Sequence, residues 1–267
     1  MGDARVKKLV AYCGGAKEVF HQPKSFLNKI PNIGNAVSNA VKSSAVIKLA
    51  EDELAFADKN QVKAVSFLDD DYPQRLKHCD DSPIVLYAKG NGSINPERAI
   101  SIVGTRNATR QGKELTEEIV RELAQADVTI ISGLAYGIDV AAHRACLKFG
   151  VPTIGCLAHG LDRIYPKENA NVAKDMLEIG ALITDFPIGT NPDRENFPKR
   201  NRIVAGMSDA TIVVEAGIKG GALITAELAC GYNRDVFAVP GRVDDPFSVG
   251  CHKLIMQNKA ALVTSGN

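Results

Sequence analysis

The sequence predicts an α/β protein: an extended Rossmann-like, doubly wound and mostly parallel sheet, preceded by a small helical N-terminal domain. From about residue 98, short apolar runs alternate with helix-length segments, which is typical of a parallel sheet covered on both faces. Earlier in the chain, apolar residues recur at three- and four-residue spacing, as they do along short amphipathic helices. We therefore expect a helical domain at residues 1–60 and the Rossmann-like domain at residues 61–267.

The N-terminal domain is predicted from three short segments with an apolar stripe, at residues 6–14, 16–22 and 24–30. A helix ending at Ile30, a Pro-x-Ile-Gly turn and a second helix from about Asn35 resemble a helix-hairpin-helix or SAM-like unit. In a helix-hairpin-helix the turn amides bind a nucleic-acid phosphate. Asn32 stands where that turn usually has glycine, and ordinary helix packing explains the same pattern.

Six apolar runs are predicted to form the main sheet. They lie at residues 99–103, 128–132, 152–157, 181–184, 210–214 and 235–239, with helix-length segments between most of them. Two more strands are expected within residues 62–92, on either side of a Tyr-Pro turn. The stretch 89–98 is rich in Gly, Asn and Pro and is the expected boundary before the main sheet.

Composition limits the classes of function. The 267 residues carry a net charge of +1, so a polyanion has to be met by a local patch of cations. Aromatic residues make up only 6% of the chain and Trp is absent, so stacking on aromatic rings is expected to be minor. No apolar run approaches 18 residues and no secretory signal is visible, so we expect a cytoplasmic protein without a membrane contact. The six Cys residues form no C-x-x-C pair, which suits free thiols in a reducing compartment.

Metal and dinucleotide sites are not expected. His143-x-x-Cys146 and Cys156-x-x-His159 could be drawn as a zinc site. Structural zinc usually uses Cys-rich knuckles in loops, whereas these pairs fall on a predicted helix and a predicted strand, so a packed helix face is favoured. Gly104 is followed by Thr, Arg and Asn, which breaks the G-x-G-x-x-G dinucleotide fingerprint. We therefore expect no metal and no cofactor.

The carboxyl ends of the predicted strands carry the candidate ligand-binding residues, because open parallel sheets bind ligands at that edge. These ends offer arginine, lysine, glycine amides and small hydroxyls, which together suit a phosphate. The predicted site residues are Gly104, Thr105, Arg106, Ser132, Gly133, Ala135, Gly137, Lys167, Arg200, Asn201, Arg202, Gly220, Gly221 and Thr225.

No nucleophile–base–orienter set, opposed carboxylate pair or P-loop accompanies these residues, so binding rather than catalysis is expected. Asp139 reads as a helix cap or first-turn acid. It shares a helix face with His143, so an acid–base pair is conceivable, but a structural pair is the simpler interpretation.

Three cations stand within four residues at Lys199, Arg200 and Arg202, in a segment between two expected strands. They suit one part of an anion-binding rim. Alternatively, Arg200 or Arg202 is buried and pairs with Glu215 or Asp185 to shape the loop.

The chain resembles the DprA family of DNA-processing proteins, also called Smf, over about residues 65–265. The motifs that carry the resemblance, in order, are GTR, SGLAYGIDVAAH, GLDRIYPKEN, FPKRNRIVAG, VVEA, GALITAELA and VFAVPGR. The resemblance implies an extended Rossmann fold, a homodimer, and binding of single-stranded DNA. It also implies protection of incoming strands in natural transformation and loading of the RecA recombinase, with no catalytic residues.

Carried over by position, the family's phosphate-binding arginine falls on Arg106, its Y-P-K lysine on Lys167 and its R-N-R motif on residues 200–202. Its glycine turns fall on Gly133, Gly137, Gly220 and Gly221. The family usually has Ser-Gly-Ser or Ser-Gly-Thr where this chain has Gly-Gly-Ala, which leaves Thr225 as the nearby hydroxyl. Some members carry a winged-helix domain beyond the point where this sequence stops, so a longer natural protein is expected.

Three other functions compete with this interpretation. The segment GGALITAE loosely resembles the P-G-G-x-G-T-x-x-E motif of Rossmann-like nucleotide N-glycosidases, but it lacks the proline and the third glycine. A dinucleotide-dependent oxidoreductase lacks its fingerprint. A protein-interaction scaffold remains compatible with DNA binding, because loading a recombinase requires a protein surface.

Overall fold

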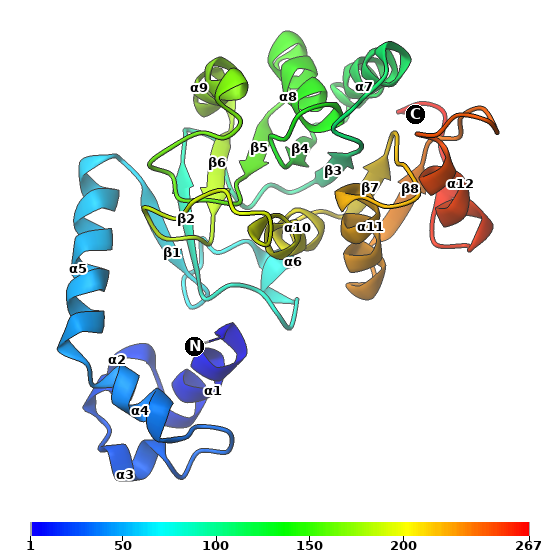
Figure 1. The fold of residues 1–267 in the computed structure, drawn as a ribbon. Coiled ribbons are helices and arrows are strands. Elements are labelled where there is room, and N and C mark those ends of the chain that lie inside the picture. The colour runs from blue at the N-terminus through cyan, green and yellow to red at the C-terminus, as the bar shows by residue number, and fades with distance from the viewer. Residues whose placement is uncertain (1, 267) are drawn as a thin grey trace.

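The computed structural model describes residues 2–266, beginning with five helices. These are α1 (Asp3–Cys13), α2 (Ala16–His21), α3 (Lys24–Leu27), α4 (Asn35–Val41) and α5 (Ser44–Lys59). The first four enclose an apolar cluster that includes Leu9, Leu27 and Val41. They form a group apart from the sheet, and α5 connects this group to the first strand (Figure 1). The change from helix to strand falls between Lys59 and Lys63.

A nine-stranded sheet forms the centre of the remaining chain, in the order β1-β2-β6-β5-β4-β3-β7-β8-β9. The strands are β1 (Lys63–Ser66), β2 (Val85–Lys89), β3 (Ala99–Val103), β4 (Thr129–Ser132), β5 (Thr153–Cys156), β6 (Ala181–Thr184), β7 (Ala210–Val213), β8 (Asp235–Ala238) and β9 (Ala261–Leu262). All pairs from β6 to β9 are parallel, whereas β1 and β2 run antiparallel at one edge. The predicted fold class is confirmed.

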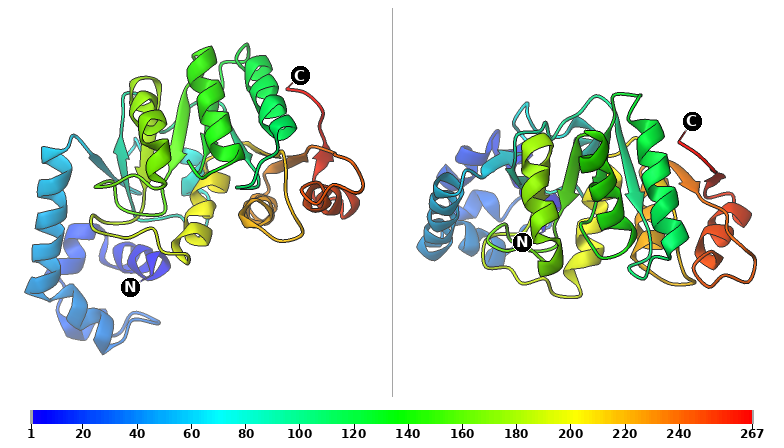
Figure 2. Two further views of the ribbon diagram at one scale, coloured as in Figure 1. Left: turned by 45° about the horizontal axis from the view of Figure 1, so that its top comes forward. Right: turned by 90° about the horizontal axis from the view of Figure 1, so that it is seen from above.

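Helices cover both faces of the sheet. They are α6 (Gln74–Lys77), α7 (Arg110–Leu123), α8 (Ile138–Phe149), α9 (Ala170–Ile179) after the 3-10 turn Lys167–Asn169, α10 (Asn196–Gly206), α11 (Gly221–Gly231) and α12 (Val249–Met256). One face carries α7, α8 and α9, and the other carries α10, α11 and α12 (Figures 1 and 2). The chain winds outward from β3 through β4, β5 and β6 on one side, and through β7, β8 and β9 on the other. The strand order therefore reverses at β3. This is the switch point of the sheet, and ligands bind in such sheets beside the carboxyl ends of the strands there, here β4, β3 and β7.

Two features of the predicted organisation are wrong. The stretch 89–98 does not separate two domains, because β2 pairs with β6 inside the same sheet. Residues 196–206, a segment between two expected strands for which no helix was predicted, form the helix α10. Pro198 lies in the first turn of α10, where a missing backbone N–H costs no helical hydrogen bond. Its buried side chains include Arg200 and Asn201, so polar residues occupy the inward face and hide the usual amphipathic pattern.

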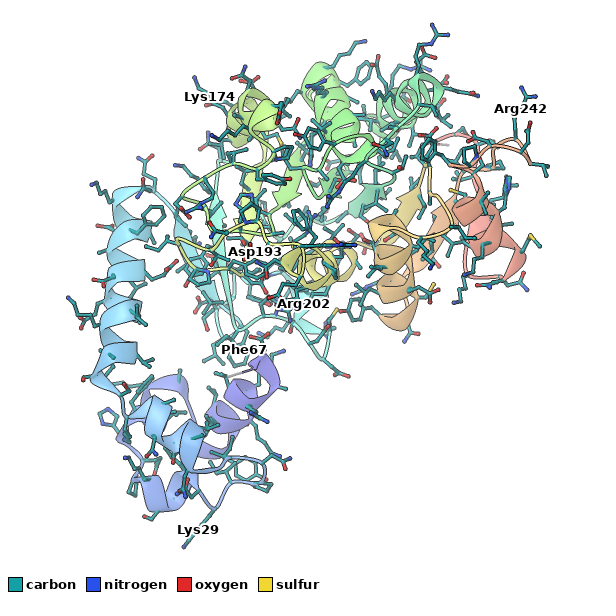
Figure 3. All side chains as sticks on the ribbon, viewed as in Figure 1. Lys29, Phe67, Lys174, Asp193, Arg202 and Arg242 are labelled. Carbon is teal, nitrogen blue, oxygen red and sulfur yellow. The ribbon has the colours of Figure 1, made fainter. Side chains whose placement is uncertain are left out.

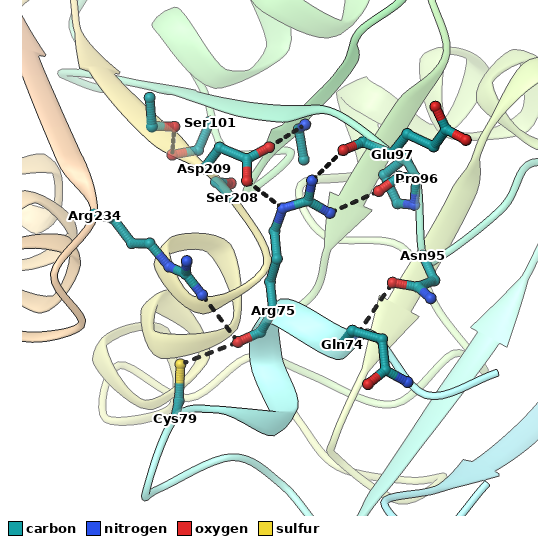
Figure 4. A network of polar contacts seen from close by, with 12 residues as sticks. Gln74, Arg75, Cys79, Asn95, Pro96, Glu97, Ser101, Ser208, Asp209 and Arg234 are labelled. Atoms are coloured by element: carbon teal, nitrogen blue, oxygen red, sulfur yellow. Dashed lines mark hydrogen bonds and ion pairs between the residues drawn. The ribbon is translucent and has the colours of Figure 1, made fainter. Parts of the chain in front are cut away.

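The amino-terminal edge of the sheet is held by a polar network around Arg75 in α6 (Figure 4). Its guanidinium donates to the Asp209 carboxylate, to the Pro96 carbonyl at 2.6 Å and to the Glu97 carbonyl. Asp209 in turn accepts the Ala99 N–H at 2.9 Å. The network ties the starts of β3 and β7 to α6, and each of the three guanidinium nitrogens donates one hydrogen bond.

Across residues 2–266, every helix is too short or too polar to cross a lipid bilayer.

Candidate functional site

A cavity of about 590 Å³ lies at the switch point of the sheet. Its walls come from the loops after β3, β4 and β7 and from the start of α10 and α11. The polar and glycine residues among its lining are Gly104, Thr105, Arg106, Gly133, Asp139, Tyr165, Arg194, Arg200, Asn201, Gly217, Lys219, Gly220, Gly221 and Thr225. Four cationic side chains thus face one carboxylate, which makes the cavity suited to an anion.

The turn after β3 is fixed by close backbone packing. A Cβ on Gly104 would lie 2.4 Å from Ile138 Cγ1, and one on Gly137 would lie 2.1 Å from the Thr105 carbonyl oxygen. Gly137 also has φ +79°, a conformation that favours glycine. The Thr105 N–H donates to the Glu215 carbonyl at 2.7 Å, and its carbonyl accepts the Ile138 N–H at 3.2 Å. These contacts hold the backbone of Arg106 at the mouth of the cavity.

Arg106 presents an exposed cation with its N–H groups available. Its guanidinium carbon lies 4.7 Å from the centre of the Phe197 ring, a cation–π contact. Phe197 in turn packs against Tyr165, with ring centroids 6.1 Å apart and an interplanar angle of 58°. Within residues 2–266, Arg106 makes no hydrogen bond or ion pair. The ring therefore orients the guanidinium without occupying the N–H groups that would bind a phosphate.

Arg200 contributes a buried charge at the base of the cavity. Its Nη1 donates to the Cys156 carbonyl at 2.5 Å, while its Nε has no partner in the described part of the chain. Burial lowers the pKa of Arg200, and the charge of Asp139 opposes this. Burial likewise raises the pKa of Asp139. The charge of Arg200 and the hydrogen bond from the Gly133 N–H, 3.2 Å from the carboxylate, act in the opposite direction. A Cβ on Gly133 would clash with both charged groups, so this glycine makes room for them.

Arg202 points away from the cavity and does not line it. Neighbouring helical residues are about 100° apart around the axis, so two positions place Arg202 nearly opposite Arg200. Arg202 is labelled below α10, on the side toward α1 (Figure 3). Its Nη2 lies 2.5 Å from Asp185, and its Nη1 lies 3.1 Å from Asp3 of α1 and donates to the Asp81 carbonyl. For Arg202 the structure therefore shows the structural interpretation, a pair with Asp185, rather than a place in the anion-binding rim. Glu215 has no arginine partner within residues 2–266; it accepts the Thr109 N–H at 3.0 Å.

The remaining predicted residues divide into two groups. Asn201 and Thr225 both line the cavity, and each donates to the Gly221 carbonyl at 3.1 Å. They therefore fix the first turn of α11, whose Gly220 and Gly221 are exposed with their amides at the cavity. Ala135 also contributes to the wall.

Ser132 and Lys167 lie outside this cavity. Ser132 is fully buried and donates to the Ile102 carbonyl at 2.6 Å, so its role is to join β4 to β3. Lys167 is exposed at the start of the 3-10 turn. It makes no hydrogen bond or ion pair through its ammonium group within residues 2–266.

Among the unpredicted residues that line the cavity, four are cationic or aromatic: Tyr165, Arg194, Phe197 and Lys219. Arg194 and Phe197 immediately precede the Lys-Arg-Asn-Arg segment, and Lys219 precedes the glycine turn. Their closeness in the sequence to predicted site residues is the feature that could have identified them. Tyr165 and Phe197 both stand in the cavity wall, and the expectation that stacking on rings is minor stays a prediction.

The alternative sites do not assemble. His143 Nδ1 is 2.7 Å from the Thr153 hydroxyl, and burial lowers its pKa to about 3. Cys146 belongs to the apolar core on which α8 packs. Within residues 2–266, no three His, Cys, Asp or Glu side chains are grouped so as to hold a metal ion. Glu227, the acid of the glycosidase-like segment, lies outside the cavity and pairs with Lys259 at 2.6 Å.

Sequence comparison extends these observations. The model of the family described as DNA recombination-mediator protein A matches residues 63–267. DNA processing protein DprA of Bacillus subtilis is 43% identical over 192 residues, covering 72% of this chain and 65% of that protein. Protein Smf of Synechocystis is 41% identical over 219 residues, covering 79% of this chain and 55% of that protein. The chain thus spans little more than half to two thirds of the length of these relatives.

Structural comparison agrees. The crystal structure of DprA from Streptococcus pneumoniae superposes with a TM-score of 0.84 at 34% identity, over 99% of this chain and 90% of that one. A structure of DNA processing protein A from Helicobacter pylori, described for its mode of single-stranded DNA binding, gives a TM-score of 0.69 at 29% identity, over 76% and 90% of the two chains. The residues matched by the family model include the whole sheet and the cavity at its switch point, and the chain belongs to the DNA recombination-mediator protein A (DprA) family.

Proposed function

We propose that this chain binds single-stranded DNA in the switch-point cavity and acts as a recombination mediator. The observation that carries the proposal is the state of Arg106, an exposed cation held over Phe197 at 4.7 Å with its N–H groups unused. The DNA-processing relatives, and the single-stranded DNA binding described for the Helicobacter pylori protein, support it.

The arrangement suits a flexible strand read through its backbone. Arg106, Arg194 and Lys219 line the cavity wall, and the amides of Gly220 and Gly221 open the helix α11 beside them. Charged side chains and helix amides bind phosphates without regard to base identity. The Tyr165 and Phe197 rings offer a base a stacking surface in the same cavity.

We infer the wider role from family membership. In this proposal the protein is a cytoplasmic homodimer without a cofactor or a catalytic reaction. It covers incoming single strands during natural transformation and passes them to the RecA recombinase. This chain holds the DNA-binding part of that role, and the proposal does not assign the surfaces for RecA or for the second subunit.

Fluorescence anisotropy of a labelled single-stranded oligonucleotide, across a salt series and with duplex as competitor, tests the DNA-binding proposal. Arg106→Ala should weaken binding at least about tenfold, because it removes a charge-assisted hydrogen-bond donor to a phosphate. It should also reduce the slope of log K against log salt by about 0.7. Arg121→Ala is the matched control, since Arg121 is exposed and stands in the last turn of α7, remote from the cavity.

Absent binding by the wild type, or equal affinities for the wild type and Arg106→Ala, would contradict the proposal. In either case hydrolysis of nucleoside monophosphates becomes the assay to run, because it tests the N-glycosidase alternative.

A further inference from the structure

A second concavity adjoins the cavity and shares Arg106 with it. This groove, of about 810 Å³, runs between α7 and α8, which lie side by side on one face of the sheet (Figures 1 and 2). One wall is a single face of α7, formed by Arg110, Lys113, Glu114 and Glu117. These positions follow the i, i+3, i+4, i+7 spacing that places side chains in a row along a helix.

Small residues open the groove between the two helices. Ala108 stands just before α7, and Gly137 and Ala141 lie at the start of α8. Arg144 follows Ala141 by three positions and contributes the facing cation. The groove therefore has a floor of short side chains and basic residues on both walls, with Arg106 at the end nearest the cavity.

The charges of the groove are unequally satisfied. Glu117 pairs with Lys148 at 2.5 Å, Glu168 accepts the Tyr136 hydroxyl at 2.7 Å, and Glu114 lies 3.6 Å from Arg110. Each acid of the groove thus has a protein partner. Lys113 and Arg144 have no hydrogen bond or ion pair through their side chains within residues 2–266. The unmatched charge in the groove is positive.

We propose that a single strand bound in the switch-point cavity passes over Arg106 and continues along the groove between α7 and α8, with its phosphates at Lys113 and Arg144. The inference rests on the proposed function, because it extends the same strand beyond the same arginine. Continuity through Arg106 and the unmatched charge of Lys113 and Arg144 favour a polyanion that is longer than one nucleotide. Side chains that bind successive phosphates extend the site without adding sequence preference.

The test uses the full chain and a labelled oligothymidylate of about 20 nucleotides, long enough to occupy both concavities. The variant Lys113→Ala/Arg144→Ala should bind several-fold more weakly, with the salt slope reduced by about 0.7 for each phosphate that is no longer neutralised. The variant Lys174→Ala/Arg121→Ala removes the same charges from exposed positions on α9 and at the far end of α7. It should retain wild-type affinity and slope.

Glu114→Gln gives an independent test of opposite sign. It removes a negative charge from the groove wall, so it should tighten binding about twofold if phosphates pass there. An affinity and salt slope of Lys113→Ala/Arg144→Ala equal to those of the control pair would overturn the groove proposal, as would weaker binding by Glu114→Gln.

These outcomes separate the two proposals. If the wild type binds, Arg106→Ala abolishes binding and the groove variants change nothing, the groove is wrong and the cavity stands. If the wild type itself does not bind single strands, the proposed function fails first.

Discussion

The two edges of the sheet use arginine in opposite ways. At the amino-terminal edge, Arg75 donates to one carboxylate and two backbone carbonyls and has little left to offer a ligand. At the carboxyl edge, Arg106 rests on an aromatic ring and makes no hydrogen bond or ion pair within residues 2–266. A cation whose donors are all satisfied holds elements together, whereas an exposed unsatisfied one is available to a partner. The partners of a cation, more than its presence, indicate which edge binds.

The same contrast is repeated across one helix. Arg200 and Arg202 are two positions apart in α10, yet Arg200 lines the cavity and Arg202 joins α10 to Asp185 and to Asp3 of the N-terminal helices. If structural and ligand-facing arginines are separate in function, substitutions of the first kind should change stability and substitutions of the second kind should change DNA affinity.

The largest effect is expected at Arg200, which belongs to both classes because it is buried and also lines the cavity. Arg200→Met leaves the buried carboxylate of Asp139 without its opposing charge, so we expect a loss of about 3 kcal/mol in the free energy of unfolding. Urea denaturation followed by circular dichroism measures it. Arg106→Met serves as the control and should leave the unfolding midpoint unchanged. An unfolding midpoint of Arg200→Met equal to that of the wild type would show that Arg200 contributes to ligand binding and not to stability.

Arg75→Ala should affect stability but not binding. It leaves the Asp209 carboxylate and two carbonyls without their donor, and we expect a loss of about 2 kcal/mol in the free energy of unfolding. The same denaturation experiment measures this loss, and anisotropy at a temperature where the variant is folded measures DNA affinity. A weaker affinity of the folded variant would mean that the two edges are not separate in function.

His143 predicts a pH dependence of stability. Its pKa is lowered to about 3 by burial and, secondarily, by the charge of Arg200. The unfolded chain therefore takes up a proton below about pH 6.5 that the folded chain refuses until about pH 3, and stability falls as pH falls through that window. Between about pH 7.5 and pH 5.5 this group should cost about 1.4 kcal/mol. Urea titrations at both pH values measure the free energy of unfolding. Its loss between the two pH values should be smaller in His143→Gln than in the wild type by about 1.4 kcal/mol. Equal losses in the two proteins would contradict the prediction.

The smallest effect concerns the ring beneath Arg106. Phe197→Leu keeps an apolar side chain but removes the surface that orients the guanidinium and offers stacking to a base. DNA affinity should fall about fivefold, or about 1 kcal/mol. Phe149→Leu is a control, because Phe149 ends α8 and also has a lysine, Lys148, over its ring. An equal loss of affinity in both variants would remove the special role of Phe197.

The strands of the sheet could be predicted well, because an apolar run is recognised from residues that are adjacent in the sequence. The run at 99–103 coincides with β3, and the helix-length segment between the runs at 128–132 and 152–157 holds α8. The helix α10 could not be predicted in the same way, since Arg200 and Asn201 face inward and break the apolar stripe. At the site, Arg106 follows from its place after a strand. Of the two acidic partners of Arg202, Asp185 was among the interpretations drawn from the sequence, whereas Asp3 was not, because it stands 199 positions away in the sequence.

Three of the four residues from Lys199 to Arg202 therefore depend on contacts with parts of the molecule that are distant in sequence. Arg200 is constrained by Asp139 and the cavity, Asn201 by the start of α11, and Arg202 by Asp185 and the N-terminal helices. Only Lys199, among these four described residues, has its single ion pair within its own helix turn, 3.3 Å from Glu195. Of these four positions, Lys199 is therefore the one that can vary among relatives. A relative that lost the N-terminal helices would lose the Asp3 pair but would still need Arg202 as the partner of Asp185.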